Sequence, residues 1–328
     1  MRLPDPLRSR AVLIGASQYD DEKLPDLPVV ARTVSDMAVA LSDPAYGAVS
    51  EGSCTVLIDE GDIRLIGRLL RSAARQAEDL LLVFYSGHGL VSGKRHELYL
   101  ALPESEWAEA EFNSLEYGKL RDAVLDSPAA TKVIILDCCF SGRVVTDTMA
   151  DPVTEVLGQI EVDGTYVLAS AQRDQVALIV PGEEYTAFTG RFLRLLRDGV
   201  ADGPELLTID DLYQRLLVTM KAEGLPQPQR RATRTAGLLA LARNRAFVVP
   251  LLRQGPEAVR NDRARIRRVL SDAERTAQSI TDEAAKARAL ADIAGTLAAT
   301  DPDRAERLAQ SITDRPLKIR ALVTIAEA

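Results

Sequence analysis

The sequence is poor in cysteine and histidine. Its 328 residues include three cysteines, two of them adjacent, and only two histidines, His88 and His96. Three cysteines in this arrangement do not make a disulfide framework, so we expect a protein of a reducing compartment, the cytoplasm. With so few histidines, a zinc site of the cysteine and histidine kind has little support. We expect no cofactor and no bound metal.

Long apolar runs and a surplus of positive charge are also missing. No stretch approaches the roughly 20 apolar residues that a membrane-spanning helix needs, and the start, MRLPDPLRSRAVLIGAS, lacks the apolar region of a signal peptide. The net charge of −8 argues against a nucleic-acid-binding surface. We therefore expect neither a membrane nor a nucleic acid as partner. With 46% hydrophobic and 27% charged residues, the chain can bury a sizeable core and remain soluble.

Short apolar runs alternate with segments of helical periodicity over residues 1–248. The runs at 11–14, 55–58, 80–85, 166–169 and 237–241 predict buried strands. Between them, apolar residues recur at intervals of three and four, as on one face of a helix. This alternation predicts an α/β fold in which a mainly parallel sheet is covered by helices on both faces.

Residues 249–328 have a different composition, rich in alanine and charged residues and without strand-like runs. Residues 273–282, AERTAQSITD, recur as residues 305–314, AERLAQSITD, at an offset of 32 residues. Apolar residues at helical spacing in each unit predict an all-α region of helical-hairpin repeats. Because three such units are usually needed to bury a continuous core, we expect the array to continue beyond residue 328. The alternative is a helical tail packed on the first domain.

The stretch TKVIILDCCFSG, residues 131–142, contains two of the three cysteines. Its apolar run predicts a strand buried on both faces, and open α/β sheets bind ligands at the carboxyl ends of such strands. Side chains at i and i+2 of a strand point the same way, so Asp137 and Cys139 share one side and Cys138 faces the other. We expect Cys138 in the core and Cys139 at a reactive site. The alternative for Cys139 is a buried structural thiol.

The predicted strand at 80–85 runs directly into the tetrapeptide SGHG. The same alternation places Ser86 and His88 on one side of the strand. His88 then lies beside Cys139 if this strand and the one at 131–142 are neighbours. A histidine within hydrogen-bond reach can take the proton of a thiol, whose ordinary pKa is near 8.5. The backbone N–H groups of Gly89 and Cys139 are candidates for binding a developing oxyanion.

Two motifs, FYSGHG at 84–89 and ILDCCFSG at 135–142, resemble the histidine and cysteine motifs of the caspase-like clan. The resemblance is closest to metacaspases and their bacterial relatives, and it covers roughly residues 8–245. It implies a caspase-like three-layer sandwich and a cysteine endopeptidase with His88 as the base and Cys139 as the nucleophile. No cofactor is implied, and the sequence does not support calcium activation.

The resemblance also implies a substrate class. In metacaspase-like enzymes the aspartate two residues before the nucleophile, here Asp137, helps to form an acidic pocket for arginine or lysine. Ser86 and Asp174 are candidates for lining the same pocket. Because a carboxylate binds guanidinium in bidentate fashion, we expect cleavage of proteins after Arg, with Lys second. The alternative for Asp137 is a cap for the backbone turn that follows the strand.

The bacterial relatives imply a regulated effector in bacterial defence or cell death, with the helical repeats binding a regulatory protein partner. Basic clusters at 227–237 and 260–268, expected in exposed linkers, are candidate sites of self-cleavage by an enzyme that cuts after Arg. One alternative is a catalytically silent scaffold that acts through its repeats. Another is a thiol hydrolase or transferase of a different kind on the same sheet.

Overall fold

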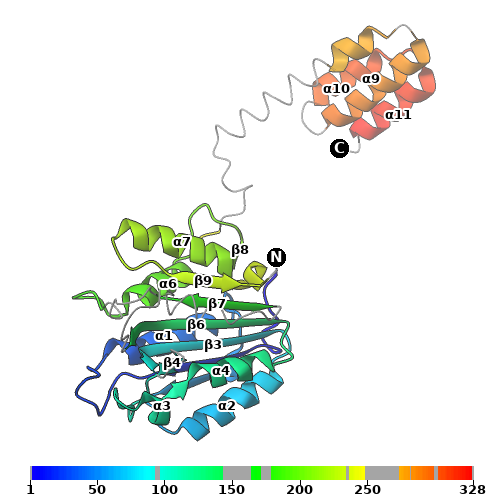
Figure 1. The fold of residues 1–328 in the computed structure, drawn as a ribbon. Helices are drawn as coiled ribbons and strands as arrows, with labels where there is room; N and C mark the ends of the chain where they lie inside the picture. The colour runs from blue at the N-terminus through cyan, green and yellow to red at the C-terminus, as the bar shows by residue number, and fades with distance from the viewer. Residues whose placement is uncertain are drawn as a thin grey trace. The chain divides into compact units, whose positions relative to one another are not determined.

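The computed structural model describes residues 2–92, 97–142, 164–170, 179–233, 236–247, 273–280, 282–298 and 302–326. By its internal contacts the chain divides into two compact units, Met1–Phe247 and Val248–Ala328 (Figure 1). Within the described ranges, no helix is long and apolar enough to cross a membrane.

An eight-stranded sheet forms the centre of the first unit. Its main path runs in the order β2 (Cys54–Ile58), β1 (Arg10–Gly15), β3 (Leu80–Ser92), β6 (Thr131–Gly142), β7 (Thr165–Ala169) and β9 (Gln229–Ala232). All neighbours on this path are parallel except β9, which is antiparallel to β7. The short β4 (Glu97–Leu100) folds back on the end of β3 and pairs with β5 (Leu115–Glu116). The expected mainly parallel sheet is confirmed.

Helices cover both faces of this sheet (Figure 1). One face carries α1 (Val29–Leu41), α6 (Ala187–Arg197) and α7 (Ile209–Ala222), and the other carries α2 (Ile63–Gln76) and α4 (Tyr117–Leu125). The one-turn helix α3 (Ala110–Asn113) lies between β4 and β5 in the chain. Alternate side chains of each buried strand serve the two faces, so the first unit is an α/β three-layer sandwich.

Threonines determine where two of the helices begin. Thr208 and Asp211 form a reciprocal capping box at the start of α7. Thr186 caps α6, its Oγ1 accepting a hydrogen bond from the N–H of Thr189 at 3.2 Å. Both helices therefore start beside polar groups that satisfy their first free N–H donors.

Two local expectations are wrong. The basic stretch at 227–237 is not an exposed linker, because Gln229–Ala232 form the edge strand β9 and Arg230 is ion-paired with Asp210. The strand expected at 237–241 begins only at Ala240. This strand, β10 (Ala240–Arg243), pairs with β8 (Leu206–Thr208) in a separate two-stranded sheet. The second basic cluster, 260–268, lies outside the described residues.

The second unit is helical where it is described. A helical segment at 273–278 precedes α9 (Glu283–Ala298), α10 (Pro302–Gln310) and α11 (Arg315–Ala326). These helices bury a core made mostly of alanine and leucine side chains. The helices α9 and α11 begin 32 residues apart, at equivalent places in the sequence repeat. Whether they belong to a longer array stays a prediction.

Candidate active site

The two predicted motifs lie on neighbouring strands. β3 and β6 pair in parallel, with His88 opposite Cys139 and Ser86 opposite Asp137. Both strands continue past their apolar runs, so all four residues lie at the carboxyl edge of the sheet, where open α/β sheets bind ligands. The structure describes the backbone of Cys139 but not its side chain, so the position of its thiol stays a prediction.

The adjacent Cys138 lies in the core. It is fully buried with Tyr85 and Leu136 in the cluster between the sheet and the helices α2 and α4. Asp137 contacts α6 on the opposite face of the sheet. Consecutive side chains of β6 thus face opposite layers, as the period of a strand requires. Cys138 is therefore a core packing residue.

The imidazole of His88 is buried, with 7% of the residue exposed. Its Nε2 lies 2.8 Å from the carbonyl oxygen of Pro25. Because a carbonyl can only accept a hydrogen bond, Nε2 carries the proton, and Nδ1 of the neutral ring is left as a proton acceptor. Burial lowers the pKa of His88, and the bond to Pro25 opposes this shift in part. A neutral imidazole of this tautomer is the form that a general base needs.

Two tyrosines contact the backbone of His88. Its N–H donates to Tyr19 Oη at 3.0 Å, and its carbonyl accepts from Tyr85 Oη at 2.8 Å. The preceding residue, Gly87, has a φ of +156°, and a Cβ added there would lie 2.6 Å from Tyr85 Oη and 2.9 Å from Tyr19 Oη. Glycine is therefore required between the two hydroxyl groups.

Asp137 is buried beneath the start of α6, with 2% of the residue exposed. Its Oδ2 accepts hydrogen bonds from the hydroxyls of Thr186 and Thr189, each at 2.5 Å. Burial raises the pKa of Asp137, while the hydroxyls of Thr186, Thr189, Ser170 and Ser86 oppose the rise. The N-terminus of α6 also favours a negative charge here. The carboxylate thus links the end of β6 to α6.

The other predicted site residues are Ser86, Gly89 and Asp174. Ser86 is fully buried. Within the described part of the chain its Oγ has no hydrogen bond of ordinary geometry. The hydroxyl nevertheless lies near enough to Asp137 to lower the pKa of that carboxyl. Gly89 is aligned with Phe140 of β6. Asp174 lies outside the described residues. In the part that the structure describes, no group of three or more His, Cys, Asp or Glu side chains is placed to hold a metal ion.

Sequence reasoning missed the groups that hold the predicted residues in place. Pro25 contributes only a backbone carbonyl, which every residue type carries, so no sequence signal could have identified it. Tyr19 acts through a loop conformation that is set by distant residues. The two threonines on α6 were detectable in part, because Thr186 stands just before a segment of helical periodicity, where a capping residue is expected.

A comparison with protein-family models identifies the family of the chain. The family model of the caspase domain matches residues 8–236. No curated protein matches the chain. Among the solved structures that match is caspase-1 from Spodoptera frugiperda, with 12% sequence identity and a TM-score of 0.49 over 69% of this chain and 88% of that chain. Because the family model spans well over half of its length, the chain belongs to the caspase family of cysteine peptidases.

Proposed function

We propose that the chain is a cysteine endopeptidase in which His88 and Cys139 form the catalytic dyad. The observation that carries this proposal is the alignment of these two residues on neighbouring parallel strands at the carboxyl edge of the sheet. The Nε2–H of the neutral imidazole donates to the carbonyl of Pro25, which supports Nδ1 as the acceptor of the thiol proton. Such a base is needed because an ordinary thiol has a pKa near 8.5 and is mostly protonated at neutral pH.

The reaction would be acyl transfer to the thiol and then to water. The Cys139 thiolate attacks the scissile carbonyl carbon and forms the C–S bond, and the oxyanion is bound by the N–H groups of Gly89 and Cys139. The His88 imidazolium gives its proton to the leaving amine as the C–N bond breaks. Water, activated by the imidazole, then hydrolyses the thioester and restores the thiol.

We also propose that the substrate is a protein cleaved after Arg, with Lys second, and that Asp137 binds the basic side chain. A buried carboxylate two residues before Cys139 supports this. Because Oδ2 already accepts two hydroxyl hydrogens, a guanidinium would reach the carboxylate through Oδ1 and place a second N–H on the Oγ of Ser86. This two-point contact favours Arg, since its donors are fixed in a planar fork. Asp174 remains a candidate for the same pocket.

Paired fluorogenic peptides that end in Arg, Lys or Asp test the assignment. The wild-type protein should cleave the Arg peptide fastest and the Asp peptide at background rate. The Cys139→Ala variant should cleave none of them. Preference for Asp would contradict the pocket assignment without affecting the dyad.

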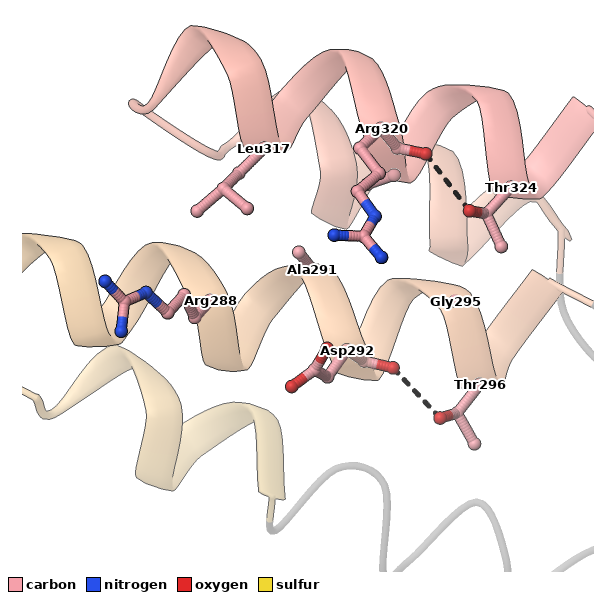
Figure 2. A pocket seen from close by; sticks show the side chains of 9 residues that line it. Arg288, Ala291, Asp292, Gly295, Thr296, Leu317, Arg320 and Thr324 are labelled. Atoms are coloured by element: carbon pink, nitrogen blue, oxygen red, sulfur yellow. Dashed lines mark hydrogen bonds between the residues drawn. The ribbon is translucent and has the colours of Figure 1, made fainter.

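A groove in the second unit supports a further function in binding a regulatory protein partner. The helices α9 and α11 line an open groove of about 730 Å³, with small and polar side chains on its walls (Figure 2). Arg288 and Arg320, at equivalent places in the two repeats, lie on facing helices and are exposed. Among the described residues, a Cβ added at Gly295 would meet only Thr324, at 3.8 Å, so a ligand can approach the backbone there. One carboxylate, that of Asp292, also lines the groove, but the two arginines outnumber it and favour a partner segment with acidic side chains.

Fluorescence anisotropy with a labelled glutamate-rich peptide tests the groove. The double variant Arg288→Ala/Arg320→Ala should weaken binding about 2- to 30-fold, since each exposed ion pair is worth about 0.2–1 kcal/mol. Equal binding by the wild type and the variant would contradict it. A catalytically silent scaffold would bind the peptide and show no hydrolysis that depends on Cys139.

By resemblance, the enzyme would act as a regulated effector in bacterial defence or cell death. The arginine cluster at 260–268 follows the first unit in the chain, and self-cleavage there would separate the peptidase from the groove. Mass spectrometry of incubated wild-type and Cys139→Ala proteins tests this. Identical intact masses would contradict self-cleavage.

A further inference from the structure

The loop between β1 and α1, residues 16–28, provides two of the groups that touch His88. Pro25 accepts the Nε2 proton of the ring, and Tyr19 Oη accepts the backbone N–H. The rings of Tyr19 and His88 also pack together, with centroids 4.8 Å apart and planes inclined by 51°. One loop therefore contacts both the side chain and the main chain of the proposed base.

The hydroxyl of Tyr19 is oriented for this contact. It donates its own hydrogen to the carbonyl of Ala16 at 2.8 Å, which leaves its oxygen lone pairs to accept from His88. Burial raises the pKa of Tyr19 well above its ordinary value, so the phenol stays protonated and neutral. The hydroxyl is thus a fixed acceptor for the His88 N–H, and it takes no part as an acid or base at neutral pH.

Further hydrogen bonds hold the loop itself. The N–H of Tyr19 donates to Asp26 Oδ1 at 3.0 Å, which ties Tyr19 to the residue after Pro25. The N–H and the Oγ of Ser17 both donate to the carboxylate of Asp59, at 2.6 and 2.7 Å. Asp59 directly follows β2 and has a φ of +53°, a left-handed conformation that persists only where its surroundings hold it in place. The end of β2 therefore anchors the loop that carries Tyr19.

Resting on the proposed function, we propose that the hydroxyl of Tyr19 is a positioning group for the base: it fixes the peptide N–H of His88 so that the imidazole stays between Pro25 and the thiol of Cys139. Glycine precedes His88 and by itself permits many backbone conformations. Without the hydroxyl, the peptide between Gly87 and His88 loses the acceptor that sets its orientation. A displacement of about 1 Å at a reacting group can cost about 100-fold in rate.

The variant Tyr19→Phe tests this, because it removes the hydroxyl and keeps the ring against the imidazole. With an Arg-ending peptide we expect kcat to fall about 10- to 100-fold and KM to change less than about threefold, since the hydroxyl contacts the base and not the substrate. The matched control is Tyr46→Phe, which makes the same change on a ring that packs against Arg245, 4.1 Å from its guanidinium carbon. The control should keep wild-type kcat.

A second readout does not depend on activity. The chain has only two histidines, so ¹⁵N-histidine NMR of the full-length protein gives two sets of ring signals, and His96→Ala assigns them. Wild-type His88 should show one tautomer, protonated on Nε2, while Tyr19→Phe should show mixed tautomers or broadened signals. A Tyr19→Phe variant with wild-type kcat, or with an unchanged His88 tautomer and line width, overturns the proposal. Absence of Cys139-dependent hydrolysis in the wild type would instead refute the proposed function, and the NMR result would still decide the role of Tyr19.

Discussion

Replacing Gly87 with alanine is expected to destabilise the first unit and to lower activity. The φ of +156° at Gly87 is costly for alanine, by about 1–3 kcal/mol. The added Cβ would also lie 2.6 Å from Tyr85 Oη and 2.9 Å from Tyr19 Oη, an overlap that costs about 1–3 kcal/mol when neighbours must shift. Together these terms predict a loss of about 2–6 kcal/mol. Both hydroxyls that would have to move contact the backbone of His88, so kcat should fall as well.

Thermal unfolding followed by circular dichroism measures the first effect. A loss of 1 kcal/mol lowers Tm by about 2–4 °C in a unit of this size, so Gly87→Ala should lower it by at least about 4 °C. Gly67→Ala in α2 is the matched control, because the atom that its added Cβ would meet in the described part of the chain is Arg71 Nη2, at 3.7 Å. A helical Gly→Ala change gains up to about 1 kcal/mol, so the control should match or exceed the wild type. A Gly87→Ala variant within about 1 °C of the wild type, on the same scale, would refute this reasoning.

Three further predictions concern the site and the scaffold. Asp137→Asn should lower kcat/KM for an Arg-ending peptide about 10- to 100-fold, because a charge-assisted hydrogen bond worth about 1.5–3 kcal/mol is lost. The Tm of this variant at pH 7 should stay the same or rise, because burial raises the pKa of Asp137 and ionising the carboxyl in the folded protein costs stability. Peptide kinetics check the change in kcat/KM, and thermal unfolding checks the Tm. Burial lowers the pKa of His88 in the folded protein below its usual value of about 6.5. The neutral ring therefore contributes stability above about pH 6.5, and this contribution is lost as the pH falls from there through the lower pKa of the folded state. Unfolding of the wild type and His88→Gln across this range should show less pH dependence in the variant, and equal slopes would contradict the assignment. Thr208→Ala should cost about 1 kcal/mol through loss of the capping box on α7 and leave kcat unchanged, as denaturant unfolding and kinetics would show.

The central sheet and its helices were predictable because burial leaves a period in the sequence. The apolar runs of β1, β3, β6 and β7 mark strands buried on both faces, and the intervening helices carry one apolar stripe each. The edge strand β9 was missed because its residues, QRRA, are polar and charged, and an edge strand needs no apolar run. The segments SGHG and CFSG are rich in glycine and serine, yet β3 and β6 go on pairing through them, because the hydrogen bonds between strands use the backbone alone.

The arrangement of the site was only partly predictable. The period of two along a strand places Cys138 in the core and Asp137 on the opposite face, and the structure confirms both positions. The same period brings Cys139 to the side of Asp137, but its role as nucleophile stays a prediction. The contacts that hold His88 come from the loop of Tyr19 and Pro25, whose conformation depends on long-range hydrogen bonds that no local pattern records.

The proposed dyad is tested by comparing Cys139→Ala with Cys138→Ala in hydrolysis of an Arg-ending peptide by the full-length protein. Cys139→Ala should reduce hydrolysis to background, because the nucleophile is gone, while Cys138→Ala should lose some stability and keep its activity. Loss of hydrolysis in Cys138→Ala with activity retained in Cys139→Ala would contradict the proposed dyad.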